Sequence, residues 1–225
     1  MAIYTATVTV AIDTTRTSRR WNEAPGNFDK LNLKALYESD NDWGIPQLAA
    51  STHIPAKLVA YNDRHACRTA ADAAVHFFLD DYRFETMWTL PNKSLERVQK
   101  VAAALTPDFS MWPQMPKVMQ LWQVYRNRWC GRWMEQHGIV VTPTISWSTP
   151  DSYEYAFLGV TRGSVVAVST VGIRSKEATW GYLQGLERML DTLEPATVLT
   201  YGRSIGETTL FPSTQFRHYP TRWEE

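Results

Sequence analysis

The sequence predicts an α/β protein built as one domain of consecutive strand–helix units. Two observations carry this prediction: apolar, β-branched runs alternate with helix-patterned segments from residue 57 to residue 201, and each run ends on polar residues. Near-continuous apolar strands between helices indicate a parallel sheet covered on both faces. Because the strands are short, with small or polar residues at their ends, we expect a TIM-like barrel, incomplete or distorted. The alternative is a doubly wound parallel sheet, since 225 residues is near the lower limit for eight units.

The apolar run 75–79 is the expected central strand, and it stops on Asp80 and Asp81. A second short strand, 106–109, carries Asp108, and Pro107 restricts its hydrogen-bond ladder. Alternating Thr and apolar residues predict an edge strand at the N-terminus. The remaining strands are expected at 3–12, 57–61, 139–147, 164–170 and 197–201.

Helices are expected between these strands from caps and 3–4 spacing of apolar residues. Ser94 and Ser175 are the expected N-caps of two of them, and Gly138 is the expected stop of a third. The expected helices are 29–38, 95–105, 116–137, 152–158 and one from Ser175 to Glu194-Pro195.

An aromatic stripe marks the helix expected over 116–137. Its members recur at helical spacing and are Met115, Val118, Trp122, Tyr125, Trp129 and Trp133. Helices bury such faces, so the stripe is read as core and not as a platform for stacking bases. Arg126, Arg128 and Arg132 lie off its centre, where they are either solvated or reach over the barrel rim.

Three regions are expected along the chain: an N-terminal strand and polar arm (1–42), a core of strand–helix units (43–202), and a polar, irregular C-terminal tail that packs on the core (203–225).

Composition excludes several classes of protein. Lys plus Arg and Asp plus Glu are 23 each, so the chain has no net field for polyanions, and a nucleic-acid partner requires a local basic patch. Cys67 and Cys130 have no metal-like spacing and are read as reduced thiols. The sequence lacks a membrane-length apolar run and a signal peptide, which predicts a cytoplasmic protein without a membrane partner.

Five motifs carry a family resemblance: LDDYRFE (79–85), LTPDFS (105–110), VYRNRW (124–129), GIVVTPTISW (138–147) and VAVSTVG (166–172). In this order, over residues 43 to 202, they resemble the uncharacterised phage and bacterial domain-of-unknown-function family 4417. The resemblance implies a home in phages or other mobile elements and supplies no mechanism.

In either parallel architecture, ligands bind at the carboxyl ends of the strands. Three acids fall there, Asp80, Asp81 and Asp108, and carboxylates that converge can hold a metal, act as acid and base, or attack a sugar carbon. The structural alternative is that they cap helices, make turns, or pair with Arg83 or Arg126. The other residues at this rim are Asn62, Asp63, Arg83, Ser146, Trp147, Ser169, Thr170, Tyr201 and Arg203.

Two hypotheses of function follow. In the first, the protein modifies a nucleotide or nucleobase, in a way that loosely resembles the tRNA-guanine transglycosylases although no cysteine-rich zinc site is present. Asp80 or Asp108 is then the nucleophile or general base, with Asp81 beside them. Arg83 and Arg126 meet phosphate, Trp147 stacks on a base, and Asn62, Thr170 and Tyr201 complete the ligand-binding set. No phosphate loop, metalloprotease motif or G-x-S-x-G elbow is present, and the sequence identifies neither a cofactor nor a metal site.

The second hypothesis is a non-catalytic factor that binds a host or phage protein, as in host takeover or anti-defence. Exposed aromatic and Arg side chains anchor such interfaces. The candidates lie outside the strand–helix units and are Arg19, Arg20, Trp21, Trp43, Phe216 and Trp223.

Overall fold

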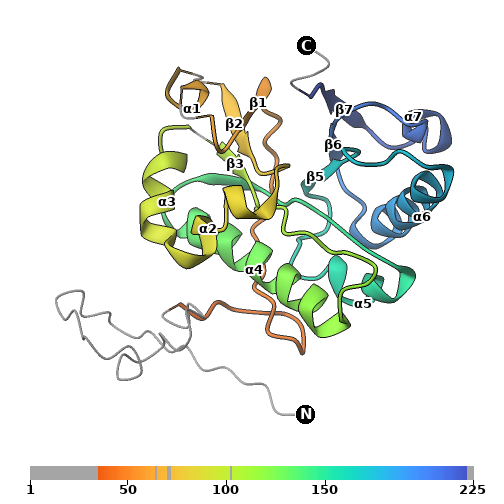
Figure 1. Ribbon diagram of the computed structural model, residues 1–225, viewed down its shortest axis with the longest axis horizontal. Helices are drawn as coiled ribbons and strands as arrows, with labels where there is room; N and C mark the ends of the chain where they lie inside the picture. Colours follow the sequence, from red (N-terminus) through yellow and green to blue (C-terminus); the bar gives the residue numbers. More distant parts are fainter. Residues whose placement is uncertain (1–34, 64, 70–71, 102, 222–225) are drawn as a thin grey trace.

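A computed structural model describes residues 35–63, 65–69, 72–101 and 103–221 of the chain. Figure 1 shows helices packed around short strands that run through the middle of the molecule. The strand expected over 3–12 and most of the helix expected over 29–38 lie outside the described residues, and residues 35–38 of that helix are not helical.

All strand pairs in the described residues are parallel. The strands are β1 (Lys57–Ala60), β2 (Ala73–His76), β3 (Ala103–Leu105), β4 (Val140–Thr142), β5 (Val165–Ser169), β6 (Thr197–Tyr201) and β7 (Phe216–Tyr219). They form two sheets of orders β1-β2-β3-β4 and β5-β6-β7, and the bridge between Thr144 and Ala167 joins them. The prediction of a parallel α/β protein is therefore confirmed. The recorded pairs establish no closed barrel, and neither sheet has the reversal in strand order of a doubly wound sheet.

Helices occupy most of the connections (Figure 1). They are α1 (Ala66–Thr69), α2 (Thr86–Thr89), α3 (Pro91–Val98), α4 (Lys117–Gln136), α5 (Tyr153–Ala156), α6 (Lys176–Leu193) and α7 (Glu207–Leu210), with 3-10 turns η3 (Asp81–Arg83) and η4 (Pro150–Ser152). The expected cap of α6 is confirmed, because Ser175 Oγ accepts a hydrogen bond from the Ala178 amide at 3.1 Å. The expected stop of α4 is confirmed by Gly138, whose φ is 80°.

Four expected elements have other bounds, for local reasons. The helix expected over 95–105 is α3, which begins at Pro91, a residue favoured in the first helical turn, and leaves Ser94 buried inside the helix and not at its cap. The strand expected over 75–79 ends at His76, whose ring nitrogen Nδ1 accepts from the Phe78 amide.

The strands that carry prolines are also displaced. The strand expected over 106–109 lies at Ala103–Leu105, so Asp108 follows the ladder instead of belonging to it. The strand expected over 139–147 stops at Thr142, before Pro143, which has no amide to donate.

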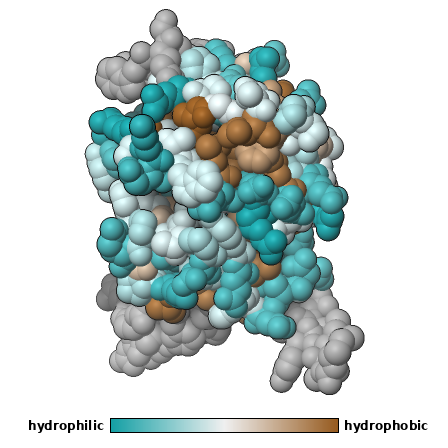
Figure 2. Space-filling view, turned by 90° about the vertical axis from the view of Figure 1, so that its right-hand side faces the viewer, coloured by the Kyte–Doolittle hydropathy of each residue, from teal (hydrophilic) through white to brown (hydrophobic). Residues whose placement is uncertain are grey.

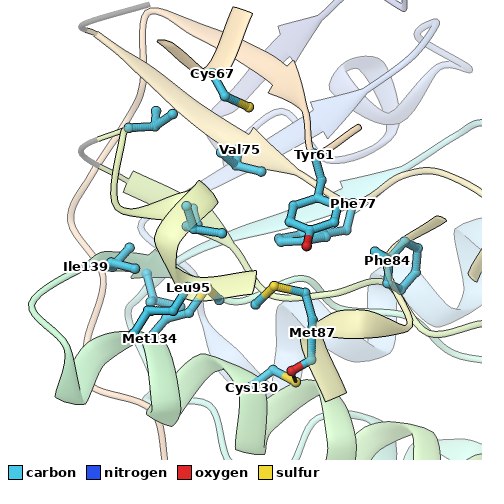
Figure 3. Packing of buried hydrophobic residues seen from close by; sticks show 14 of the residues in the cluster. Tyr61, Cys67, Val75, Phe77, Phe84, Met87, Leu95, Cys130, Met134 and Ile139 are labelled. Carbon is cyan, nitrogen blue, oxygen red and sulfur yellow. Dashed lines mark hydrogen bonds between the residues drawn. The ribbon is translucent and has the colours of Figure 1, made fainter. Parts of the chain in front are cut away.

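The core has one apolar cluster under each layer of helices. In Figure 3, Phe77, Met87, Leu95, Cys130 and Met134 point toward one another between α3, α4 and the first sheet. The second cluster packs α6 against β5 and β6 through Leu186, Met189 and Val198. A third lies between the two sheets and contains Ala74, Phe78, Leu105, Ala167, Leu199, Tyr201 and Tyr219.

The aromatic stripe of α4 is core, as expected, with Trp129 only 1% exposed; Val118, in the first turn of α4, is the exception and faces solvent. Arg126 and Arg128 are buried rather than solvated. Cys67 and Cys130 are free, buried thiols.

The segment expected to be a polar tail contributes regular structure. Its β7 pairs with β6 in the register Thr200↔His218, and α7 precedes it. The hydroxyl of Tyr219 donates to the Pro55 carbonyl at 2.6 Å, which ties the last strand to the segment before the first.

Candidate active site

Asp81 connects the exits of two neighbouring strands. It opens η3, directly after the segment that leaves β2, and its carboxylate accepts from Ser110, which follows β3. The Ser110 hydroxyl donates to Oδ1 at 2.8 Å and the Ser110 amide donates to Oδ2 at 3.1 Å. Because β2 and β3 are parallel neighbours, their exits reach the same edge of the sheet, as the sequence predicts.

Asp108 is the second acid at this edge. It accepts a hydrogen bond from the hydroxyl of Ser146, which follows β4. The pKa of Asp108 is raised to about 6, mainly by burial; the Ser146 hydrogen bond acts to lower it, and the negative charge of Asp81 acts to raise it. Ser110, whose amide and hydroxyl hydrogen-bond Asp81, lies two residues past Asp108, so the two acids are held at the same edge of the sheet. A carboxyl group with a pKa near 6 can hold or release a proton close to neutral pH, which is the property of a general acid–base.

Two buried residues of α4 hold the strand exits in place. Asn127 Nδ2 donates to the carbonyls of Pro107, at 2.8 Å, and Thr144, at 3.3 Å. Arg128 Nη1 donates to the same Thr144 carbonyl at 3.0 Å. Pro107 immediately precedes Asp108, and Thr144 lies two residues before Ser146, so α4 fixes the backbone that presents the acid and its hydroxyl donor.

Arg128 is unusual in its partners. Its other hydrogen bonds go to the carbonyls of Leu158 and Ala156 and to the Asn127 side chain, and no carboxylate of the described residues pairs with it. Its burial lowers its pKa to about 9. A small cavity with room for about one water molecule lies beside it, lined in part by Thr144 and Ser146. The Thr144 hydroxyl is buried there without a partner.

The other predicted charged residues are engaged elsewhere. Asp80, 66% exposed, pairs with Arg83 at 3.0 Å on the surface. Arg126 pairs with Glu85 at 2.7 Å and lies over the Phe109 ring, 3.9 Å from its centroid. Asp81 pairs with neither arginine. The structural alternative, an ion pair with an arginine, therefore holds for Asp80, and Arg126 is paired with Glu85 instead of with one of the three acids. Asp81 and Asp108 lie at the same edge of the sheet.

The remaining predicted ligand residues lie around this edge in different surroundings. Trp147, next to Ser146, packs against Tyr182 of α6, with ring centroids 5.3 Å apart. Thr170 is buried and donates to the Arg203 carbonyl at 2.9 Å. Tyr201 stacks on Phe78 inside the third cluster, and Asn62 is exposed after β1.

Sequence reasoning missed Ser110, Asn127 and Arg128. Ser110 lies two residues past Asp108, and the predicted set of site residues ended at this acid. Asn127 and Arg128 lie within the VYRNRW motif. The aromatic residues of this helical turn pack in the core, so the two strongly polar side chains of the same turn must be buried with them. That burial is the signal for their role. Within the described ranges, no group of three or more His, Cys, Asp or Glu side chains could hold a metal ion.

Of the residues proposed for a protein interface, only two are described. Trp43 is 51% exposed, and Phe216 is half-buried in β7, against the α6 cluster. Arg19, Arg20, Trp21 and Trp223 lie outside the described residues. No helix that the structure describes is long and apolar enough to cross a membrane.

Comparison with known proteins identifies a family and two phage relatives. The family model "Domain of unknown function (DUF4417)" matches residues 37–220. The Gene 1 protein of Mycobacterium phage L5 is 45% identical over 213 residues, which cover 93% of this chain and 93% of that protein. The Gene 1 protein of Mycobacterium phage D29 is 44% identical over 213 residues, which cover 93% of this chain and 78% of that protein. No solved structure matches.

The fold and the strand-end acids thus define a parallel α/β phage protein with a carboxylate pair at the edge of its first sheet. The chain belongs to the DUF4417 family. The match confirms the resemblance and extends it beyond residue 202, to include β7.

Proposed function

We propose that Asp81 and Asp108 form an acid–base site that cleaves or exchanges the bond between a nucleobase and its sugar. The observation that carries the proposal is the raised pKa of Asp108 beside a second carboxylate that two Ser110 donors keep in place. When two carboxyl groups have different surroundings, one can stay protonated and donate a proton while the other stays ionised. Glycosyl transfer relies on this arrangement.

In the proposed reaction, protonated Asp108 gives its proton to the base nitrogen as the bond between that nitrogen and the sugar carbon breaks. Ionised Asp81 stabilises the positive charge that develops on the sugar. Water, or an incoming base, then attacks the sugar carbon and returns a proton to Asp108. Ser146 and Asn127 act as positioning residues, because one bonds the Asp108 carboxylate and the other holds the Pro107 carbonyl before it.

The proposal also takes the two sheets as arcs of an incomplete TIM-like barrel. It is supported by the sequential strand order, the bridge between Thr144 and Ala167, and the apolar cluster shared by strands of both sheets. In such an arrangement all the strand exits face one rim, which is where barrel enzymes hold their substrates. The relatives named as phage proteins support a setting in the host cytoplasm.

The test is release or exchange of a nucleobase from nucleosides, nucleotides and short oligonucleotides, followed by chromatography. Asp108→Asn is expected to lower the rate by at least about 100-fold, the scale of general acid catalysis. Asp80→Asn is the matched control, since Asp80 is an exposed acid of the same loop, and should leave the rate within about 2-fold.

Activity that survives in Asp108→Asn would overturn the assignment of the acid. If no substrate of this class reacts or shifts the melting temperature of the wild type, the proposal fails as a whole. The binding of a host or phage protein would then be the function to pursue.

A further inference from the structure

The chain has zero formal net charge, so a nucleic-acid partner requires a local basic surface. One such surface lies at the start of α6. Arg174 and Lys176 flank the N-cap Ser175, and no carboxylate in the described part of the chain pairs with either. Arg203 adds a third cation, because its Nη2 donates to the Ile173 carbonyl at 3.0 Å.

An aromatic side chain lies among these cations. Trp180 is 65% exposed and, with Leu183, forms one wall of a shallow hollow of about 250 Å³ that Arg174 and Lys176 also line. The acid in this segment is Glu177, and its pKa is lowered by hydrogen bonds from its own backbone amide and from Ser175, so it is engaged with the end of the helix. Figure 2 looks onto the side of the molecule that carries α6 and α7, where hydrophobic side chains are gathered among hydrophilic ones.

The hollow and the candidate active site both adjoin helix α6. Trp147 follows Ser146, the partner of Asp108, and its ring packs against the buried Tyr182 of α6, whereas Trp180, two residues earlier, is exposed on another face of the helix. The segment that leads into α6 follows the carboxyl end of β5, and β5 runs parallel to the chain at Thr144. The hollow and the two acids therefore belong to the same rim.

We propose that the surface formed by Arg174, Lys176, Trp180 and Arg203 binds single-stranded nucleic acid next to the active site. Cations that track phosphates and an exposed ring on which a base can stack are the two components of such surfaces. The inference rests on the proposed function for the nature of the substrate: a strand held at the hollow presents a neighbouring nucleotide to Asp81 and Asp108. A duplex, with its bases already stacked, does not engage Trp180.

The experiment is a fluorescence-anisotropy titration of the full chain with a labelled single-stranded DNA, its RNA counterpart and the corresponding duplex. Trp180→Ala is expected to weaken single-strand binding about 10-fold, and Trp180→Phe to restore most of it. Trp43→Ala is the matched control, because Trp43 is also a half-exposed tryptophan and lies outside the hollow.

Salt dependence tests the cations. Three phosphate contacts on a single strand predict a slope of about −2 for log K against log salt, and Lys176→Gln should make it shallower by about 0.7. Arg188→Gln, on the exposed side of α6, removes the same charge and should leave the slope unchanged.

The outcomes separate this inference from the proposed function. A wild type that binds the single strand but releases no base counts against the proposed function and leaves this inference standing. If Trp180→Ala and Trp43→Ala weaken binding equally, or if duplex binds as well as single strand, the inference is overturned even where base release is intact. It is also overturned if a protein partner and no nucleic acid depends on Trp180.

Discussion

Trp147 lies so close to Gly185 that a Cβ atom built on this glycine would be 2.0 Å from the indole nitrogen. The Trp147 ring fills the space beside Gly185 on α6, and any residue with a Cβ atom would occupy that space. The candidate site and the helix that carries the proposed nucleic-acid surface are thus in direct contact.

Gly185→Ala should therefore force Trp147 out of its place and destabilise the protein by roughly 2 kcal/mol or more, as overpacking in a well-filled core does. Gly181→Ala is the matched control one turn earlier, where nothing lies within 4 Å of a new Cβ. That change should be neutral or stabilising by up to about 1 kcal/mol, because alanine is the better helix former. Thermal unfolding of both variants checks the difference, and equal melting temperatures would contradict it.

Asp108→Asn should make the folded protein more stable at pH 7.5 while it abolishes the proposed activity. Burial raises the pKa of this acid from 3.8 to about 6, so above pH 6 the fold carries a charge that it disfavours. At 1.36 kcal/mol per pKa unit, the gain should be on the order of 1–3 kcal/mol. Urea denaturation measures it, with Asp80→Asn expected to change stability by less than about 0.5 kcal/mol. A loss of stability in Asp108→Asn would show that the ionised carboxylate does not destabilise the folded protein.

The pH dependence of stability should combine two opposite effects. Between pH 3.8 and about 6, folded Asp108 keeps a proton that the unfolded chain has lost, so this contribution to stability falls as pH rises. Burial lowers the pKa of His76 from 6.5 to about 4, so the unfolded chain gains a proton that the folded one refuses, and this contribution rises with pH.

The variants Asp108→Asn and His76→Asn should separate these two contributions to the pH dependence of stability between pH 4 and 6. Stability should rise with pH more steeply in Asp108→Asn than in the wild type, and His76→Asn should shift the slope the other way. Denaturation midpoints across this range provide the measurement. Parallel curves for all three proteins would refute the assignment.

Arg128→Met should destabilise the protein by about 3 kcal/mol or more, because it removes the Arg128 donors from the carbonyls of Ala156 and Leu158 and leaves the Thr144 carbonyl with only its 3.3 Å bond from Asn127. Arg128→Lys should recover only part of the loss, since one ammonium group cannot reproduce the planar fork. Arg162→Lys is the comparison on the surface, where the pair with Glu194 is exposed and the effect should stay within about 0.5 kcal/mol. Equal losses at the two positions, measured by chemical denaturation, would remove the special role given to Arg128.

Periodicity and strand ends were enough to predict the parallel class, the long helices α4 and α6, and that the segments carrying Asp81 and Asp108 follow neighbouring parallel strands. They could not predict which acid faces outward. Asp80 and Asp81 are adjacent, and the turn of η3 decides that the first pairs with Arg83 and the second with Ser110. Composition also gave no sign that Arg126 and Arg128 are buried, because acceptors from distant loops satisfy Arg128 and those loops meet only in the fold.

Strand boundaries differed for a related reason. Hydrophobic runs continue past the ladders of β2 and β3, since Phe77, Phe78 and Phe109 are buried as loop residues. Apolar character reports burial, and a strand also needs a neighbour that offers amides and carbonyls in register. The tail was expected to be irregular, but β7 finds such a neighbour in β6.

In the described residues, the backbone connection between the two sheets is one bridge, Thr144 to Ala167, with hydrogen bonds from the Ile145 amide to the Ala167 carbonyl and from the Ala167 amide to the Pro143 carbonyl. The third apolar cluster also lies between the sheets, where Phe78 stacks on Tyr201 of β6. Ser146 and Trp147 follow the bridge directly. A ligand bound beside them should stabilise this connection, so that slower amide exchange in β6 and β7 would report occupation of a site whose acids, Asp81 and Asp108, follow β2 and β3.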